Sequence, residues 1–275
     1  MLYHYTSIEK LKHILETQKF WLTKISDFEN ASEFRHTISM LCKELTLSAL
    51  DHDKLLSVIT KTNNLVFVGC FCSDVDRPYL WKNYGELNIE FSKNVLMDMV
   101  SYQQRTFGYI SAHSSDFLHC EYCSERQEAV IKSALKQWSK ENGHTIPVND
   151  LSHLATLFKK SEFCPEQETR LVLYLKDGSP IKTLKKQSKI INCWELPFRT
   201  NNGSQPIKSI TIGPINRCDE VERDLRVLLN KHQLGNIAIN HSRISYEEFS
   251  NSQSLNQAKG CQNCEWFLPT SPVCN

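Results

Sequence analysis

The first residues of the chain place a histidine between two aromatic side chains and directly before two hydroxyl groups. The segment reads Leu2, Tyr3, His4, Tyr5, Thr6, Ser7. Strand-like residues lead here into a helix start, and a helix N-terminus offers hydrogen-bond donors to a diphosphate or a ribose. A single histidine near a chain start is more often structural or exposed. His4 is therefore a candidate nucleotide contact whose role depends on what the fold places beside it.

Two carboxylates stand two residues apart much later in the chain, at Glu166 and Glu168, just before Arg170. On a strand, side chains at this spacing face the same side. In a partly apolar cleft such a pair pushes its own titrations apart, and one member can bind a ribose hydroxyl or stabilise a developing cation. The alternative is a solvated acidic strand start that pairs with Arg170 and Lys176.

Two large aromatic residues, Trp81 and Tyr84, follow a strand-length apolar run at helical spacing. Aromatic rings can stack on a nicotinamide or an adenine, although a pair at this spacing more often packs in a core. Both interpretations stay open on the sequence.

Two Cys-x-x-Cys elements, Cys120 to Cys123 and Cys261 to Cys264, supply four thiolates, and Cys274 is a spare ligand. Two such pairs can meet the tetrahedral geometry of structural zinc. The pairs are far apart in the sequence, however, and the first overlaps a predicted strand. Reduced structural cysteines are the favoured interpretation, so no metal ligand is assigned.

Several common catalytic motifs are absent from the sequence. It contains no Gly-x-x-x-x-Gly-Lys-Ser/Thr loop, no Gly-x-Gly-x-x-Gly turn, no Gly-x-Ser-x-Gly elbow and no His-Glu-x-x-His helix. These absences argue against a P-loop enzyme, a Rossmann enzyme, an α/β-hydrolase and a zinc protease of that type.

The elements that must position the candidate residues follow from hydrophobic periodicity. Thr6 to Glu9 has the spacing of a capping box that opens a helix, and Asn149 can cap another. Strands are predicted at residues 3–5, 20–22, 65–72, 87–91, 107–110, 117–121, 169–175, 190–194, 207–212 and 237–239. Further helices are predicted at residues 32–47, 53–60, 130–138, 151–158 and 219–229. Blocks of strands with helices between the blocks predict an α+β fold with mainly antiparallel sheets.

Composition sets limits on the class of protein. The chain has 275 residues, 40% hydrophobic and 23% charged, which suits one folded domain over 1–249 and a polar, cysteine-containing tail over 250–275. A net charge of +1 gives no argument for or against nucleic acid, and the basic run at 182–189 is expected to be a solvated loop. No apolar leader or bilayer-length run is present, so we expect a cytoplasmic protein without a membrane partner. The odd count of 11 cysteines fits a reduced chain.

Six short motifs occur in an order that resembles the bacterial DUF2971 family over residues 2 to 249. They lie at 3–7, 20–22, 70–73, 81–84, 166–170 and 242–246. The usual Asn-Asp-Pro after the second strand of that family stands here as Glu29, Asn30 and Ala31, and neither cysteine pair belongs to the pattern. The opening segment is in turn similar to the first strand of ADP-ribosyltransferases.

The second resemblance implies a fold, a co-substrate and roles for named residues. The implied fold is ADP-ribosyltransferase-like, with split antiparallel β-sheets and surrounding and inserted helices, and the co-substrate is NAD. Glu168 would be the catalytic carboxylate, Glu166 would orient the acceptor, and His4 would act in both catalysis and binding. The implied NAD-binding residues are His4, Tyr5, Thr6, Trp81, Tyr84 and Arg170.

The expected function is therefore an NAD-dependent ADP-ribosyltransferase, a glycosyltransferase that modifies a protein or a nucleic acid. The resemblance suggests a bacterial toxin or an antiviral defence effector, with an antitoxin or inhibitor protein as a partner. Two alternatives remain: a non-catalytic module that binds a nucleotide or a partner, and a zinc-dependent nucleic-acid binder.

Overall fold

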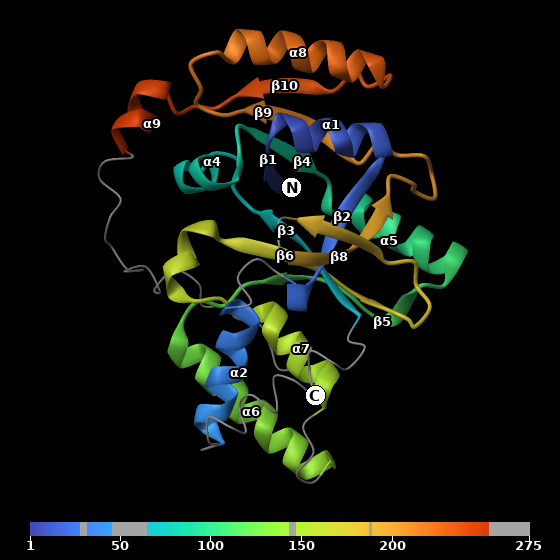
Figure 1. Ribbon diagram of the computed structural model, residues 1–275, viewed down its shortest axis with the longest axis vertical. Coiled ribbons are helices and arrows are strands. Elements are labelled where there is room, and N and C mark those ends of the chain that lie inside the picture. The colour runs from blue at the N-terminus through green and yellow to red at the C-terminus, as the bar shows by residue number, and fades with distance from the viewer. Residues whose placement is uncertain (28–31, 46–64, 143–146, 187–188, 253–275) are drawn as a thin grey trace.

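The computed structural model describes residues 1–27, 32–45, 65–142, 147–186 and 189–252 (Figure 1). The helix predicted at 53–60, the loop at 29–31, the second cysteine pair and Cys274 lie outside the described residues. Strands are β1 (Leu2–Thr6), β2 (Lys19–Lys24), β3 (Val66–Cys72), β4 (Leu87–Phe91), β5 (Ile110–His119), β6 (Glu168–Leu175), β7 (Lys182–Lys186), β8 (Lys189–Pro197), β9 (Ile207–Ile212) and β10 (Ala238–His241). Helices are α1 (Ile8–Thr17), α2 (Ser32–Glu44), α4 (Pro78–Tyr84), α5 (Lys93–Phe107), α6 (Ser124–Asn142), α7 (Val148–Leu157), α8 (Cys218–Lys231) and α9 (Tyr246–Ser252), with short 3-10 turns η1 (Ile25–Asp27) and η2 (Ser161–Glu166).

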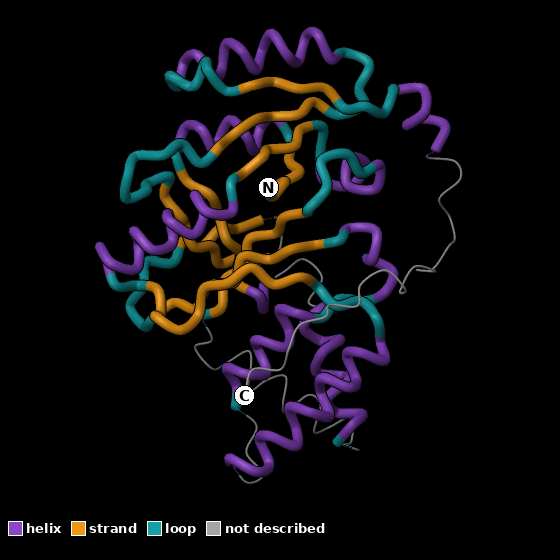
Figure 2. Tube along the Cα trace, turned by 180° about the vertical axis from the view of Figure 1, so that it is seen from behind, coloured by secondary structure: helices purple, strands orange, loops and turns teal. Residues whose placement is uncertain are grey.

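The strands form one open, mostly antiparallel sheet. Its main path runs β10-β9-β4-β1-β3-β2-β8-β7, and β6 pairs with both β3 and β5. Only the pair β9 and β10 is parallel among the described strands, and α8 connects these two. Figure 2 shows the strands running through the middle of the molecule with helices at both ends. The predicted mixture of helices with a mainly antiparallel sheet is confirmed at this level.

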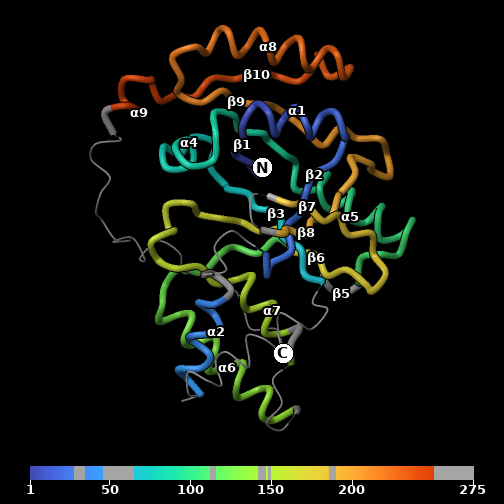
Figure 3. The backbone as a smooth tube through the Cα atoms, viewed as in Figure 1, coloured from blue at the N-terminus to red at the C-terminus, as the bar shows by residue number. Residues whose placement is uncertain are grey.

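Helices cover both faces of the sheet because strand residues alternate between two apolar cores. One core takes Phe67 and Phe71 of β3 and packs against α1, α5 and α8. The other takes Val66 and Val68 of the same strand and packs against α2, α6 and α7. Figure 3 shows α2, α6 and α7 together below the strands. The run of apolar residues predicted as a central strand is thus buried on both faces, as β3.

The sheet opens locally between β1 and β2. Along one edge of β3, β1 pairs at Tyr3 with Cys72, and β2 pairs at Thr23 and Lys24 with Val68 and Phe67. The other edge of β3 pairs with β6 over the whole strand. Residues 69–71 therefore have no strand partner on the first edge within the described chain, and their backbone is accessible to side chains.

Several local predictions were wrong. Helices α4 and α5 were missed, although Leu96, Met99, Val100 and Gln103 of α5 are buried at helical spacing. The two weak strands near residues 107–121 are one strand, β5, and the basic run expected as a loop forms β7 and the start of β8. Lysines suit the exposed edge strand β7 because their charge opposes pairing with other chains.

Helix starts and the tail boundary also differ from expectation. Ser7, not Thr6, caps α1 by accepting from the Lys10 backbone N–H, and Pro147 precedes α7 where Asn149 was expected. Helix α9 continues to Ser252, past the predicted domain end at residue 249. Residues 253–275 are not described.

Asp76 joins two parts of the chain that lie far apart in the sequence. Its Oδ1 accepts from Trp81 Nε1 at 2.8 Å and from Ser242 Oγ at 2.6 Å. Its Oδ2 accepts from the Arg243 backbone N–H at 2.6 Å. The carboxylate thereby fixes α4 to the segment between β10 and α9.

We expect Asp76→Ala to lower the free energy of unfolding by about 2–3 kcal/mol, because donors to a charged acceptor lose their partner. The matched control is Asp224→Ala, at an exposed position on α8, which should cost less than about 0.5 kcal/mol. Urea denaturation of both variants measures the difference. Equal stability of the two variants would contradict the role given to Asp76.

Candidate functional site

A cavity of about 440 Å³ lies where the opening of the sheet meets α4 and η2. It is lined by side chains from β1, α1, β2, β3, α4 and β6, together with residues of the η1 and η2 turns and of β8. His4 and Glu168 both line it, although one comes from the first strand of the chain and the other from β6. The lining residues are Tyr3, His4, Tyr5, Lys10, Thr23, Asp27, Cys70, Phe71, Cys72, Leu80, Asn83, Tyr84, Lys159, Glu166, Glu168 and Ile191.

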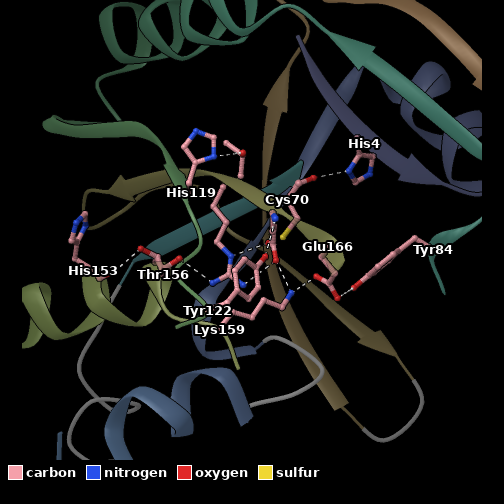
Figure 4. Close-up of polar contacts among 12 residues, drawn as sticks. His4, Cys70, Tyr84, His119, Tyr122, His153, Thr156, Lys159 and Glu166 are labelled. Carbon is pink, nitrogen blue, oxygen red and sulfur yellow. Dashed lines mark hydrogen bonds and ion pairs between the residues drawn. The ribbon is translucent and has the colours of Figure 1, made fainter. Parts of the chain in front are cut away.

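His4 bridges the gap that the opening leaves beside β3. Its Nδ1 lies 2.9 Å from the Cys70 carbonyl oxygen, and its ring packs edge-on against Phe20. Because a carbonyl can only accept, Nδ1 carries the proton and Nε2 is the acceptor in the neutral ring. Burial lowers the pKa of His4 to about 4, so the ring is neutral at physiological pH. Figure 4 shows the His4 ring directed at Cys70.

Two backbone donors at the start of α1 are already engaged. The Ile8 N–H donates to Glu86 Oε1 at 2.9 Å, and the Lys10 N–H donates to Ser7 Oγ at 3.4 Å. The sequence-based idea that this helix start offers its donors to a diphosphate therefore needs correction. The Lys10 side chain, which lines the cavity, is the nearby cationic group.

Four charged side chains, Lys159, Glu166, Glu168 and Arg170, form a buried cluster that we call the charge cluster. Each is at most 5% exposed. Lys159 Nζ bonds Glu166 Oε2, and it lies 2.6 Å from Glu168 Oε2. Arg170 Nε donates to Glu168 Oε1 at 2.9 Å, and its Nη1 donates to the Thr156 carbonyl at 3.0 Å. Figure 4 shows Lys159 reaching toward Glu166, which faces Tyr84.

The side chains of Glu166 and Glu168 both point toward Lys159, but not because of the alternation of side chains along a strand. Glu168 begins β6, whereas Glu166 ends the turn η2. Gln167 between them is in the left-handed region at φ 45° and ψ 48°. A non-glycine residue held there stores strain that the surrounding contacts must balance. Both carboxylates reach Lys159 because of this turn.

The two carboxyl groups titrate in opposite directions, as expected for such a pair. Burial raises the pKa of Glu166, against the opposing effect of Lys159. Burial alone would raise the pKa of Glu168 as well, but the charges of Arg170 and Lys159 outweigh it and hold that pKa well below its usual range. Glu168 is therefore the fixed anion of the charge cluster.

Tyr84 connects the charge cluster to α4. Its hydroxyl donates to Glu166 Oε1 at 2.8 Å, its side chain is 42% exposed, and burial raises its pKa. Gly85 follows with φ +133°, and a Cβ at this position would lie 2.4 Å from the Thr6 carbonyl oxygen. Only glycine lets α4 come so close to the end of β1, so Gly85 positions Tyr84 over the cavity.

Three residues that the resemblance implied as NAD contacts do not line the cavity. Trp81 is buried against Tyr5, with ring centroids 4.6 Å apart, and packs on Gly213. Thr6 is fully buried at the end of β1. Arg170 is fully buried and holds Glu168 and Thr156. Trp81 and Thr6 are core residues, and Arg170 reaches the cavity only through Glu168.

Tyr5 lines the cavity, but its hydroxyl already has partners. It donates to the Asp74 carbonyl at 3.3 Å and accepts from the Arg77 N–H at 3.0 Å. Burial raises the pKa of Tyr5, so the phenol is neutral. Its role in the site is to shape the wall rather than to offer a free donor.

Sequence reasoning missed three members of the site. Lys159 follows a helix without any motif, and its ion pairs appear only when η2 and β6 fold around it. Tyr122 lies inside the first cysteine pair, and its hydroxyl accepts from the Glu168 backbone N–H at 2.8 Å. Cys70 was noted only as part of the motif at 70–73, yet its thiol faces the charge of Glu168, and burial and that charge both raise its pKa.

The first cysteine pair, Cys120 and Cys123, lies within the described residues, and Cys123 makes a hydrogen bond to a carboxylate. Cys123 Sγ donates to Glu125 Oε2 at 2.9 Å. Across the described ranges, no group of three or more His, Cys, Asp or Glu side chains is placed to hold a metal ion. No helix of the described chain is both long and apolar enough to cross a membrane.

Comparison with known proteins adds no relative. The chain matches no protein-family model, no curated protein and no solved structure. The resemblance to the DUF2971 family stays a prediction, and the function has to be argued from the cavity itself.

Proposed function

We propose that the protein is an ADP-ribosyltransferase that takes NAD into the cavity and transfers ADP-ribose to a macromolecule. The observation that carries the proposal is the cavity lining: His4 of β1 and Glu168 of β6 face one space, and Tyr84 and Glu166 border it. The volume of about 440 Å³ falls within the range of small-molecule sites. The local opening of the sheet beside β3 leaves room for this cavity between β1 and β2.

The chemistry requires an anion near the ribose and little else. Cleaving the bond between nicotinamide and ribose builds positive charge on the sugar, while nicotinamide leaves as a neutral molecule without needing a proton. A fixed carboxylate stabilises that charge electrostatically. Glu168 suits this role because Arg170 and Lys159 keep it ionised and immobile.

Transfer then requires a proton to leave the acceptor as its nucleophile bonds to the sugar carbon. A carboxylate whose pKa lies above the usual range is a suitable general base. Glu166 has a raised pKa and lies at the cavity wall beside Tyr84. In this proposal Glu166 removes the proton from the acceptor. Neutral His4 Nε2 accepts a hydrogen bond from a ribose hydroxyl.

The test is release of nicotinamide from NAD, followed by transfer of labelled ADP-ribose in cell lysate. Wild type should release nicotinamide, and Glu168→Gln should release it at least about 100-fold more slowly, because the charge that stabilises the transition state is lost. Glu162→Gln is the matched control, since that side chain is 64% exposed on η2. Digestion of the labelled product with nuclease or protease identifies the acceptor class. No release by wild type would overturn the proposal.

A second candidate is a nucleotide-binding module without catalysis. The observation in its favour is that both Glu168 oxygens are engaged, one by Arg170 and the other by Lys159 and Arg170. Calorimetry separates the two candidates: NAD binding without nicotinamide release supports the module, whereas binding with release supports the transferase.

A further inference from the structure

We propose that Lys159 is a positioning residue of this site, which holds Glu166 and Glu168 in fixed geometry and keeps Glu166 ionised at the cavity wall. Its ammonium group bonds one oxygen of each carboxylate. The catalytic part of the inference rests on the proposed function, whereas the protonation part does not.

The charges of the charge cluster balance only when Lys159 is present. The charge cluster holds two carboxylates, one guanidinium and one ammonium, which sum to zero, and all four are buried. Unbalanced buried charge is costly, and a group with too little compensation takes up or loses a proton instead. Without Lys159 the cluster would carry one excess negative charge. Arg170 would still hold Glu168, so Glu166 is the group that would bind the proton.

The backbone of Lys159 is held by hydrogen bonds on both sides. Its N–H donates to the Glu121 carbonyl at 3.1 Å. Its own carbonyl accepts from Gln127 Nε2 at 2.8 Å, and Gln127 is fully buried on α6. A lysine on a flexible stem is usually a mobile point charge, but here the backbone on both sides is fixed. The fixed backbone of Lys159 therefore restricts the position of its ammonium group and of the two glutamate side chains bound to it.

The ammonium group of Lys159 is surrounded by side chains from η2 and β6. Glu166 comes from η2, Glu168 and Arg170 come from β6, and the Phe163 ring lies 5.1 Å from Nζ. Within the described part of the chain, the titratable groups that these charges also affect include Cys70, Tyr79, Tyr84 and Tyr122. The thiol and the three phenols have raised pKa values and are neutral at pH 7, so they cannot replace the positive charge of Lys159.

The experiment compares the titration of Glu166 in wild type and in Lys159→Met. Carboxyl carbons labelled with ¹³C report protonation by NMR, and Glu166→Gln identifies the signal. In Lys159→Met the midpoint of Glu166 should rise by about 1–3 pH units, because an adjacent opposite charge is removed. Lys160→Met, whose side chain is 42% exposed, is the matched control and should leave the midpoint in place. An unchanged Glu166 midpoint in Lys159→Met would overturn the inference.

A double variant covers the case in which Lys159→Met fails to fold. Lys159→Met with Glu166→Gln removes one charge of each sign and leaves Glu168 with Arg170. It should be more stable than Lys159→Met alone, with a higher midpoint of thermal unfolding. A double variant that is no more stable than Lys159→Met would contradict the charge balance given to the charge cluster.

The activity readout separates this inference from the proposed function. If wild type releases nicotinamide, Lys159→Met should lower kcat about 100-fold with little change in KM, as expected when reacting groups are misplaced, and Lys159→Arg should recover part of the rate. If wild type releases none, the proposed function fails while the titration still decides whether Lys159 controls Glu166. A kcat of Lys159→Met equal to that of wild type would overturn the catalytic role given to Lys159.

Discussion

Replacing Arg170 with methionine is expected to lower the free energy of unfolding by about 3–5 kcal/mol, the usual cost of removing one partner of a buried ion pair. Arg170 is fully buried, and its side chain donates to both oxygens of Glu168 and to the Thr156 carbonyl. Methionine fills similar space but leaves Glu168 with Lys159 as its only cationic partner among these contacts. Chemical denaturation at pH 7 measures the loss.

The matched control is Arg126→Met. Arg126 is 49% exposed and donates to both oxygens of Glu121, so the chemistry resembles that of Arg170 without the burial. Exposed pairs contribute about 0–1 kcal/mol. Similar losses in the two variants would show that burial does not strengthen the dependence of the fold on Arg170, and the charge cluster would lose its structural role.

Hydrophobic periodicity predicted the elements in which burial is uniform along the element. The apolar run that became β3 has no polar residue to obscure it, and β4 and β9 were placed almost to the residue. Helix α5 was missed because its buried positions are separated by many polar side chains. β7 was missed because lysine suits both an exposed loop and an edge strand.

The site was only partly accessible from the sequence, because its members meet by folding rather than by spacing. His4, Tyr84, Glu166 and Glu168 were singled out and line one cavity. Lys159 gave no local signal, since nothing in its neighbours distinguishes it from the half-buried Lys160. Trp81 shares the helical spacing of Tyr84, but the close contact with Gly213 directs its ring into the core.

The candidate side chains form hydrogen bonds within the protein, which explains how a polar cavity is compatible with a stable fold. His4 satisfies the Cys70 carbonyl that the opening of the sheet exposes, and Tyr84 satisfies Glu166. Buried polar groups cost free energy unless they are hydrogen-bonded, so these contacts stabilise the fold before any ligand binds. A ligand has to add to this network, and two groups that line the cavity suit it: the acceptor His4 Nε2 and the exposed cation Lys10.

His4 should make the stability of the protein depend on pH between about 4 and 6.5. The pKa of His4 is about 4 in the folded chain, against an ordinary value of 6.5. As the pH falls below 6.5, the unfolded chain takes up a proton that the folded chain does not bind, so the free energy of unfolding decreases. The decrease reaches about 3 kcal/mol near pH 4 and then stops, because one pKa unit corresponds to about 1.4 kcal/mol.

His4→Asn isolates this effect from the titration of the carboxylates. An asparagine amide can donate to the Cys70 carbonyl much as Nδ1 does, but it does not titrate. The variant should therefore keep most of its stability at pH 7 and lose about 3 kcal/mol less than wild type between pH 6.5 and pH 4, by the same linkage. Urea denaturation across this range measures both slopes. Parallel slopes would mean that His4 takes up its proton at the same pH in the folded and the unfolded chain, and the lowered pKa assigned to buried His4 would have to be abandoned.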